Sequence, residues 1–186
     1  MIRMKSFNKI IVALLMVTMP LMASAQFIEK ASQRMEITTV ESGDDGFAST
    51  EYEVFKMNGD GSYWLSVGHL GIGGDIVQLQ FDPLYELFIP LGDTIDEAIG
   101  TMQDLKDLYK KPKLFTTEVK GCLAAAYPSE NLETVTLTNR RFLASKLLEF
   151  SVKRDDLIRA TYIDKSSLGS LLNGLKFYKK LHPKEQ

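Results

Sequence analysis

Cysteine and histidine are scarce in this 186-residue sequence. Cys122 is the only cysteine, so no intramolecular disulfide can form and the fold must be stabilised by packing. A catalytic thiol would need a nearby histidine, and the chain has only His69 and His182. HExxH, CxxC and GxSxG motifs are absent from the sequence. We therefore predict no catalytic residues, no metal and no cofactor, and we interpret Cys122 as a small strand residue.

Long apolar runs are also missing, except for one near the N-terminus at residues 10–19. Three basic residues precede this run, and residues 23–25 follow as Ala-Ser-Ala, the small-x-small pattern of signal peptidase sites. The run is too short to span a bilayer. We predict a signal peptide over residues 1–25 and a periplasmic or secreted product, residues 26–186, that is soluble. Since the residue directly after the cleavage point is Gln26 and not cysteine, we do not expect a lipoprotein.

Charge is divided unevenly along the chain. Residues 26–112 hold 16 acidic and 6 basic residues, a net charge of −10, whereas residues 113–186 hold 8 acidic and 13 basic residues, a net charge of +5. Such asymmetry indicates either an external partner or attraction between the halves. The first interpretation predicts a basic ligand-binding face, composed of Arg140, Arg141, Lys153, Arg154 and Arg159. We favour the second, in which acidic and basic halves attract within one molecule or between copies, because it needs no additional ligand.

Alternating apolar residues separated by turn signals predict four strands in each half. Those of the first half are expected at 51–57, 62–69, 76–81 and 84–89, separated by NGDG, GIGGD and DP. Those of the second half are expected at 115–126, 132–138, 143–152 and 157–163. Asp93 or Thr94 can cap a first helix that Pro112 ends, and Thr94 with Glu97 fits a capping box. A second helix begins at Ser166 or Ser167.

The two predicted helices end alike, as LKDLYKKPK from Leu105 and as LKFYKKLHPK from Leu175. An offset of 70 residues superposes their apolar stripes, which extend to Leu108 and Leu181. The strand count and order match as well. We therefore predict an α+β fold of two related antiparallel ββββα units in tandem, residues 26–112 with an N-terminal extension and residues 113–186, which form one compact domain.

This order of elements resembles that of Whirly and PUR-type proteins, which pair two four-strand-plus-helix units about a pseudo-two-fold axis. The resemblance covers most of residues 26–186 and is topological, without a shared motif. It implies sheets that bind single-stranded nucleic acid. Such binding needs a basic groove with aromatic platforms, but the aromatic residues Tyr52, Phe55, Tyr63 and Trp64 lie in the acidic half. We therefore do not expect nucleic acid as a partner.

These observations predict an exported, non-catalytic binding or assembly module of the bacterial cell envelope. Its partner would be an unidentified protein or envelope ligand, and the asymmetric halves allow a homo-oligomer. The alternative is a small hydrolase of envelope glycans or peptides. Acidic pairs such as Asp44 with Asp45 and Asp155 with Asp156 lie in predicted turns, so they do not identify its catalytic carboxylates.

Processing of the N-terminus can be tested directly. If the Ala-Ser-Ala sequence is a cleavage site, the mature protein begins at Gln26. The intact mass of protein recovered from the periplasm or medium of the expressing cell should match residues 26–186. Recovery of the full-length mass from that fraction would contradict the prediction.

Overall fold

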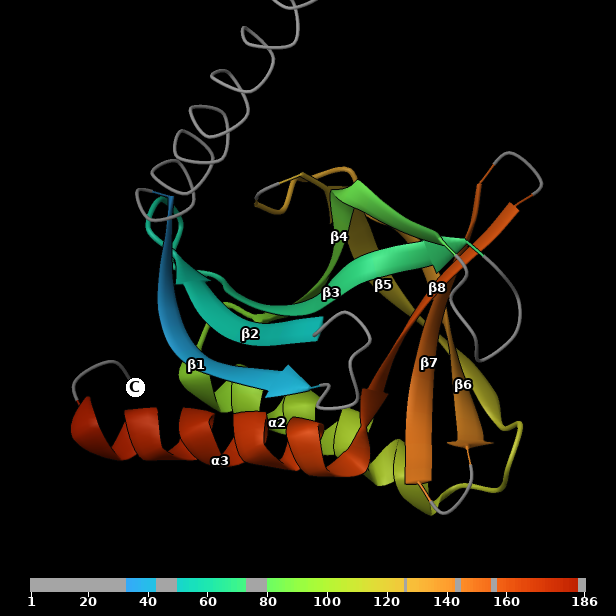
Figure 1. The fold of residues 1–186 in the computed structure, drawn as a ribbon. Helices are drawn as coiled ribbons and strands as arrows, with labels where there is room; N and C mark the ends of the chain where they lie inside the picture. The colour runs from blue at the N-terminus through green and yellow to red at the C-terminus, as the bar shows by residue number, and fades with distance from the viewer. Residues whose placement is uncertain are drawn as a thin grey trace, which may run out of the picture.

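The computed structural model describes residues 33–42, 50–72, 80–125, 127–142, 145–154 and 157–183. They form an α+β fold with an eight-stranded antiparallel sheet and two helices, which pack together against one face of the first strands (Figure 1). The strands are β1 (Arg34–Ser42), β2 (Thr50–Met57), β3 (Tyr63–Ile72), β4 (Gln80–Gly92), β5 (Thr116–Ala124), β6 (Glu133–Phe142), β7 (Ser145–Arg154) and β8 (Leu157–Asp164). The helices are α2 (Ile95–Asp107), the short 3₁₀ helix η1 (Leu108–Lys110) and α3 (Lys165–Leu181). Four strands thus precede each long helix.

The strand order in the sheet follows the order in the chain, and each strand is antiparallel to the next. β8 also returns to pair with the end of β3, through Gly71 with Ala160 and Ile72 with Arg159. Figure 1 shows β8 crossing the end of β3 at this point. The buried hydroxyl of Thr161 adds a hydrogen bond of 3.1 Å to the carbonyl oxygen of Val67. The two halves of the chain are therefore joined directly through their backbones.

The first half contains four strands, but two of them differ from the predicted set. β4 runs unbroken through Asp82 and Pro83, so the predicted turn between strands 76–81 and 84–89 is wrong; residues 76–79 lie outside the described part. Pro83 can lie inside β4 because the register between β3 and β4 shifts in this region, and an irregular ladder tolerates the missing N–H of a proline. The fourth strand is β1, in the segment expected to be an extension.

The start of α2 confirms the predicted capping box. The Thr94 hydroxyl accepts a hydrogen bond from the Glu97 amide, while the Glu97 carboxylate accepts bonds from the amides of Asp93 and Thr94. These hydrogen bonds lower the pKa of the Glu97 carboxyl, and the bond from the Asp93 amide contributes most. The predicted apolar stripe faces the core, where Ala98, Met102 and Leu105 are buried.

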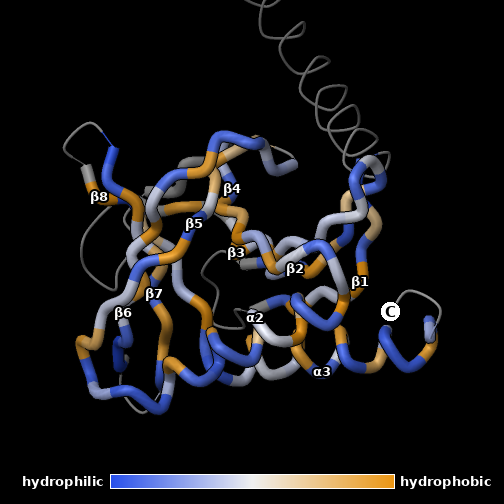
Figure 2. Tube along the Cα trace, turned by 180° about the vertical axis from the view of Figure 1, so that it is seen from behind, coloured by the Kyte–Doolittle hydropathy of each residue, from blue (hydrophilic) through white to orange (hydrophobic). Residues whose placement is uncertain are grey.

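The second helix begins earlier than predicted. Its N-cap is Asp164, whose carboxylate accepts hydrogen bonds from the amides of Ser166 and Ser167 at 2.7 and 3.0 Å. Leu171 and Leu175 of the predicted apolar stripe are buried, but Leu181 at the end of the stripe is 60% exposed. The physical reason is that the end of α3 extends past α2 and the sheet (Figures 1 and 2).

Close contact between α3 and β1 depends on Gly174. A Cβ atom at this position would lie 2.7 Å from the Cβ of Thr38, which is too short for two carbon atoms. Figure 2 shows apolar residues alternating with polar ones along the strands. Buried apolar residues of β2 and α3 belong to one core cluster, and Ile37 and Val40 of β1 pack against it. Glycine therefore allows the helix of the second half to approach the first half's sheet.

Replacing Gly174 with alanine tests this contact. The Gly174→Ala variant should lose on the order of 1–3 kcal/mol of unfolding free energy, because overpacking outweighs the better helix propensity of alanine. Gly100→Ala is the matched control in α2, because a Cβ there would meet no described atom within 4 Å; it should gain up to about 1 kcal/mol. Urea denaturation measures both. A Gly174→Ala variant as stable as Gly100→Ala would contradict the close packing.

Candidate functional site

A second apolar cluster lies on the sheet face opposite the helices, here called the outer face. Phe55 and Phe88 are fully buried there, with ring centroids 5.8 Å apart in an edge-to-face arrangement. Cys122 lies opposite Phe88 in the neighbouring strand and is also fully buried. Strand alternation produces this cluster, since Val54 and Leu87 point to the helix-covered core instead. Both faces of the central strands are therefore packed.

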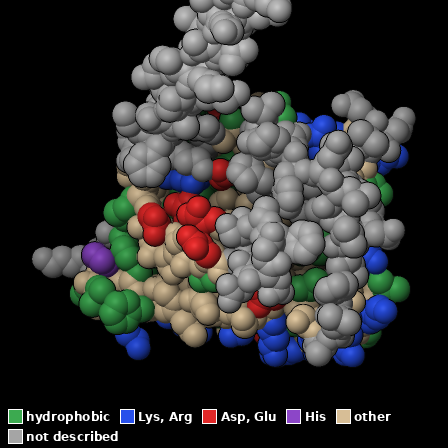
Figure 3. Space-filling model, in the orientation of Figure 1, with side chains coloured by type: hydrophobic (Ala, Val, Ile, Leu, Met, Phe, Trp, Pro, Cys, Tyr) green, Lys and Arg blue, Asp and Glu red, His purple; other side chains and the backbone are tan. Residues whose placement is uncertain are grey.

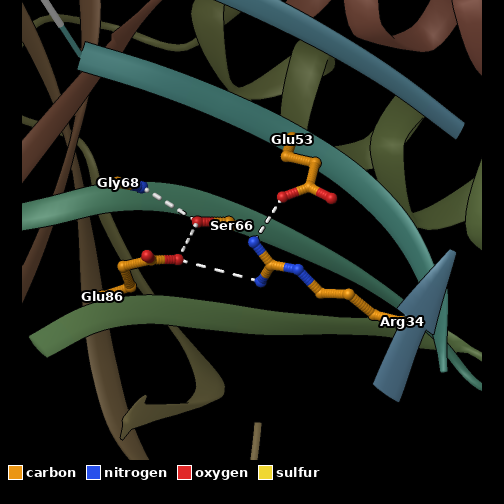
Figure 4. Close-up of polar contacts among 5 residues, drawn as sticks. All are labelled: Arg34, Glu53, Ser66, Gly68 and Glu86. Carbon is orange, nitrogen blue, oxygen red and sulfur yellow. Dashed lines mark hydrogen bonds and ion pairs between the residues drawn. The ribbon is translucent and has the colours of Figure 1, made fainter. Parts of the chain in front are cut away.

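Arg34, the first residue of β1, lies over this cluster. Its guanidinium carbon is 4.4 Å from the centroid of the Phe55 ring and 5.8 Å from that of Phe88. One guanidinium nitrogen donates to Glu53 at 2.6 Å, and the other lies 3.8 Å from Glu86 (Figure 4). The three side chains are only 7–9% exposed. A buried cation between two buried carboxylates satisfies the requirement that buried charges be paired.

Ser66 and Gly68 extend this network along β3. The Ser66 hydroxyl donates to Glu86 at 3.2 Å and lies 3.4 Å from the Gly68 amide, whose hydrogen bond it accepts. The register between β3 and β4 shifts between Ser66 and His69, and Gly68 has a φ angle of +81° there. That angle favours glycine. The irregular ladder thus turns a backbone amide toward the network. We call Arg34, Glu53, Ser66 and Glu86 the Arg34 network.

The geometry of the Arg34 network favours a structural or binding role over acid–base catalysis. A catalytic carboxylate pair needs two environments that separate the two pKa values. Glu53 and Glu86 instead share one guanidinium, and Glu86 also accepts the Ser66 hydroxyl. A nucleophilic serine needs a base free to take its proton. Across the described ranges, no three His, Cys, Asp or Glu side chains lie close enough together to hold a metal ion.

The environment of Cys122 confirms that it is a small packed strand residue. Burial raises the pKa of its thiol, which therefore stays protonated, and the sulfur accepts a weak hydrogen bond from the Ser129 amide at 3.4 Å. A reactive cysteine needs an exposed, electropositive environment. The outer-face cluster thus uses Cys122 for packing.

Further acidic side chains lie along β1 and β2, the strands that carry Arg34 and Glu53. Glu36, Glu41 and Glu51 are exposed on β1 and β2, and Figure 3 shows acidic side chains gathered over these strands. Glu41 lies directly opposite Glu51 in the ladder, an arrangement in which like charges repel. The buried Thr39 hydroxyl oxygen lacks a hydrogen-bond partner within the described part of the chain. We call Glu36, Glu41 and Glu51 the acidic row.

The residues of the predicted basic face lie on two faces of the sheet. Strand alternation and register place Arg140 and Lys153 on one face and Arg141, Arg154 and Arg159 on the other. Arg140 forms two hydrogen bonds of 3.1 Å with Glu149, and Arg154 forms two with Glu133 at 2.7 and 3.2 Å. Arg140 and Arg154 therefore already pair with carboxylates of the same sheet. Ligand binding by the five residues stays a prediction.

Comparisons with protein-family models, with curated proteins and with solved structures found no match. The topological resemblance to Whirly and PUR-type proteins therefore stays a prediction. In the ranges described, none of the helices has the length and apolar character needed to cross a membrane.

The Arg34 network was missed in the sequence because the segment now seen as β1 was read as an extension. The available signal was the alternation of charged and apolar residues from Arg34 to Ile37. That pattern could have indicated a strand, but not which carboxylates its arginine would meet. Glu53 and Glu86 are distant in sequence, and only the sheet brings them together.

Removing the arginine tests the importance of the network. The Arg34→Leu variant should lose about 3–5 kcal/mol of unfolding free energy, because two carboxylates would remain buried without their cation. Arg154→Leu is the matched control, since Arg154 and Glu133 are 41% and 25% exposed; it should lose less than about 1 kcal/mol. Urea denaturation avoids the salt that would screen the exposed pair. Equal losses in the two variants would contradict the role assigned to Arg34.

Proposed function

We propose that this protein is an exported, non-catalytic binding or assembly module of the bacterial cell envelope, and that the acidic row binds a positively charged protein surface. The supporting observation is the direct opposition of Glu41 and Glu51 on an exposed sheet face. Repulsion between them costs stability in the isolated protein. A cationic partner would relieve that repulsion. The relief would add to the binding free energy, although the Glu41–Glu51 pair destabilises the isolated fold.

Export is the part of the proposal that rests on the sequence of residues 1–25. Its basic start, apolar run and Ala-Ser-Ala ending have the order of a secretory signal. This segment lies outside the described residues. The absence of a usable disulfide, with Cys122 buried, means that the exported fold would depend on its core in an oxidising compartment.

The second half of another copy supplies a positively charged surface for the acidic row. Arg34, Arg140 and Arg154 each pair with a carboxylate of their own half, and such pairs leave the net charges of −10 and +5 unchanged. Lys179 and Asp96 join the halves through one ion pair. Opposite net charges that persist on the two halves favour a head-to-tail contact between copies.

We also infer that the two units are related by duplication. The observations that support this are the matching order of four strands and a helix, and the burial of Leu105 and Leu175, which are 70 residues apart, in one core. The two helices pack against each other. The units would then be related by an approximate two-fold axis, as the topological resemblance to Whirly and PUR-type proteins implies.

Sedimentation velocity across a salt series tests the proposed assembly. At roughly 0.01 M salt, where charges act over about 30 Å, the mature protein should self-associate, and it should dissociate by about 1 M salt, where screening acts within about 3 Å. Glu51→Lys should weaken association, because it replaces the repulsion with Glu41 by an internal pair. Glu130→Lys, an equal charge change at an exposed position of the basic half, should not weaken it.

Two results would contradict the assembly. A monomer at every salt concentration would remove the second copy as the partner. An associated state indifferent to salt would show that apolar surface, rather than the acidic row, holds it together.

A further inference from the structure

The connection between η1 and β5 displays apolar side chains on an unusual backbone. Residues 110–115, here called the basic loop, read Lys-Lys-Pro-Lys-Leu-Phe. Leu114 has a φ angle of +65°, in the left-handed region that leucine seldom adopts. Its side chain is 55% exposed and that of Phe115 is 37% exposed, so burial does not offset the backbone strain at Leu114. Strain that the surrounding structure maintains is a pointer to function.

Asn139, a buried residue of β6, forms four hydrogen bonds with η1 and the basic loop. The Asn139 side-chain amide donates to the carbonyl oxygens of Leu108 and Lys111 at 2.9 and 2.7 Å. Its backbone oxygen accepts from the Leu114 amide at 2.8 Å, and its backbone amide donates to the Phe115 carbonyl at 3.0 Å. Asn139 is only 4% exposed. The loop is therefore fixed from β6 in the shape that holds Leu114 outward.

Positive charge surrounds the exposed apolar side chains. Lys111 and Lys113 are exposed, and the Lys111 ammonium lies 5.6 Å from the centroid of the Phe115 ring. Lys110 is 72% exposed and pairs with Asp107. Across the β6–β7 ladder, exposed Arg141 lies opposite Lys146, whose ammonium donates to the Tyr109 carbonyl. Figure 3 shows Lys and Arg side chains along this lower end of the molecule.

We propose that the basic loop binds the surface of an anionic phospholipid bilayer. Leu114 and Phe115 would enter the interfacial layer, and the lysines would contact the phosphates of the headgroups. The inference goes beyond the proposed function, since it uses neither the acidic row nor the Arg34 network. It also agrees with the division of charge, because the basic half would face the anionic surface while the half with a net charge of −10 would be directed away from it.

Three features favour a bilayer over an acidic protein. The apolar side chains lie on a loop, held outward, rather than in a packed strand face. Leu114 and Phe115 have no polar group, which suits an acyl boundary that offers no hydrogen bonds. All three cations in the loop are lysines, which interact as point charges on flexible stems. Carboxylates of a protein partner are better matched by the planar fork of arginine.

Vesicle co-sedimentation of the mature protein provides the test. Wild type should bind vesicles of equal parts phosphatidylglycerol and phosphatidylcholine at low salt, and should not bind pure phosphatidylcholine. Lys113→Glu should weaken binding at least tenfold, because about fivefold is lost for each unit of charge near an anionic surface and the change is two units. Lys176→Glu is the control, an equal change at an exposed position in the C-terminal part of α3, and it should cost less than threefold.

Leu114→Asn separates the apolar contribution from folding. Asparagine accepts the left-handed backbone more readily than leucine, so the variant should fold at least as stably as wild type. It should nevertheless bind the same vesicles several-fold more weakly, because the apolar side chain is lost. Urea denaturation of the same preparation checks that the fold is intact.

Several results would overturn the proposal. Equal losses for Lys113→Glu and Lys176→Glu would show that only overall charge matters, and unchanged binding by Leu114→Asn would remove the apolar contact. Equal binding to pure phosphatidylcholine would remove the charge requirement. Absence of wild-type vesicle binding would exclude the bilayer. If Lys113→Glu then also abolished self-association in sedimentation velocity, the loop would be assigned to the acidic row of another copy.

Discussion

The position of β1 depends on the contact between Gly174 of α3 and Thr38. An edge strand with polar residues at alternate positions cannot be held by its ladder to β2 alone. The missing side chain at Gly174 lets α3 support β1 from the core side, close to the strand backbone. Once β1 is in place, its first residue, Arg34, reaches over Phe55 on the opposite side. Helix docking in the second half of the chain therefore determines which cation reaches the outer face of the first.

The two faces of β1 are consequently coupled through physically different contacts. Steric fit governs the contact on the helix side, where a methyl group at position 174 would clash with Thr38. Electrostatics decides the outer side, where Arg34 is surrounded by Glu53, Glu86 and two aromatic rings. Loss of either contact should release the strand that carries Glu36 and Glu41. The acidic row is thus built on the part of the sheet that is most dependent on long-range contacts, and a partner that binds there would stabilise the fold by mass action.

Sequence reasoning succeeded where local chemistry decides structure and failed where distant contacts decide it. The capping box of Thr94 and Glu97 and the apolar stripe of α2 involve neighbours within a turn or two, so their pattern is visible in the chain. Pro83 also gives a strong local signal, but pairing with an irregular part of β3 overrides it and β4 continues. The Arg34 network could not be predicted, because its carboxylates come from β2 and β4 and depend on register. Likewise, the charge count revealed an asymmetry between halves but not that alternation would send Arg140 and Arg141 to opposite faces.

The two similar helix endings illustrate how one sequence pattern acquires two different surroundings. After α2, the chain continues into β5. The side-chain amide of Asn139, in the second half, donates hydrogen bonds to the carbonyl oxygens of Leu108 and Lys111. After α3, Leu181 and His182 continue past the sheet, with the imidazole stacked on Tyr178 of the same helix. The two similar endings thus present their lysines in a fixed loop in one case and on a projecting helix in the other. The basic loop spans the boundary between the halves, since Lys110 and Lys111 belong to the first half, whereas Leu114, Phe115 and the Asn139 that fixes them belong to the second.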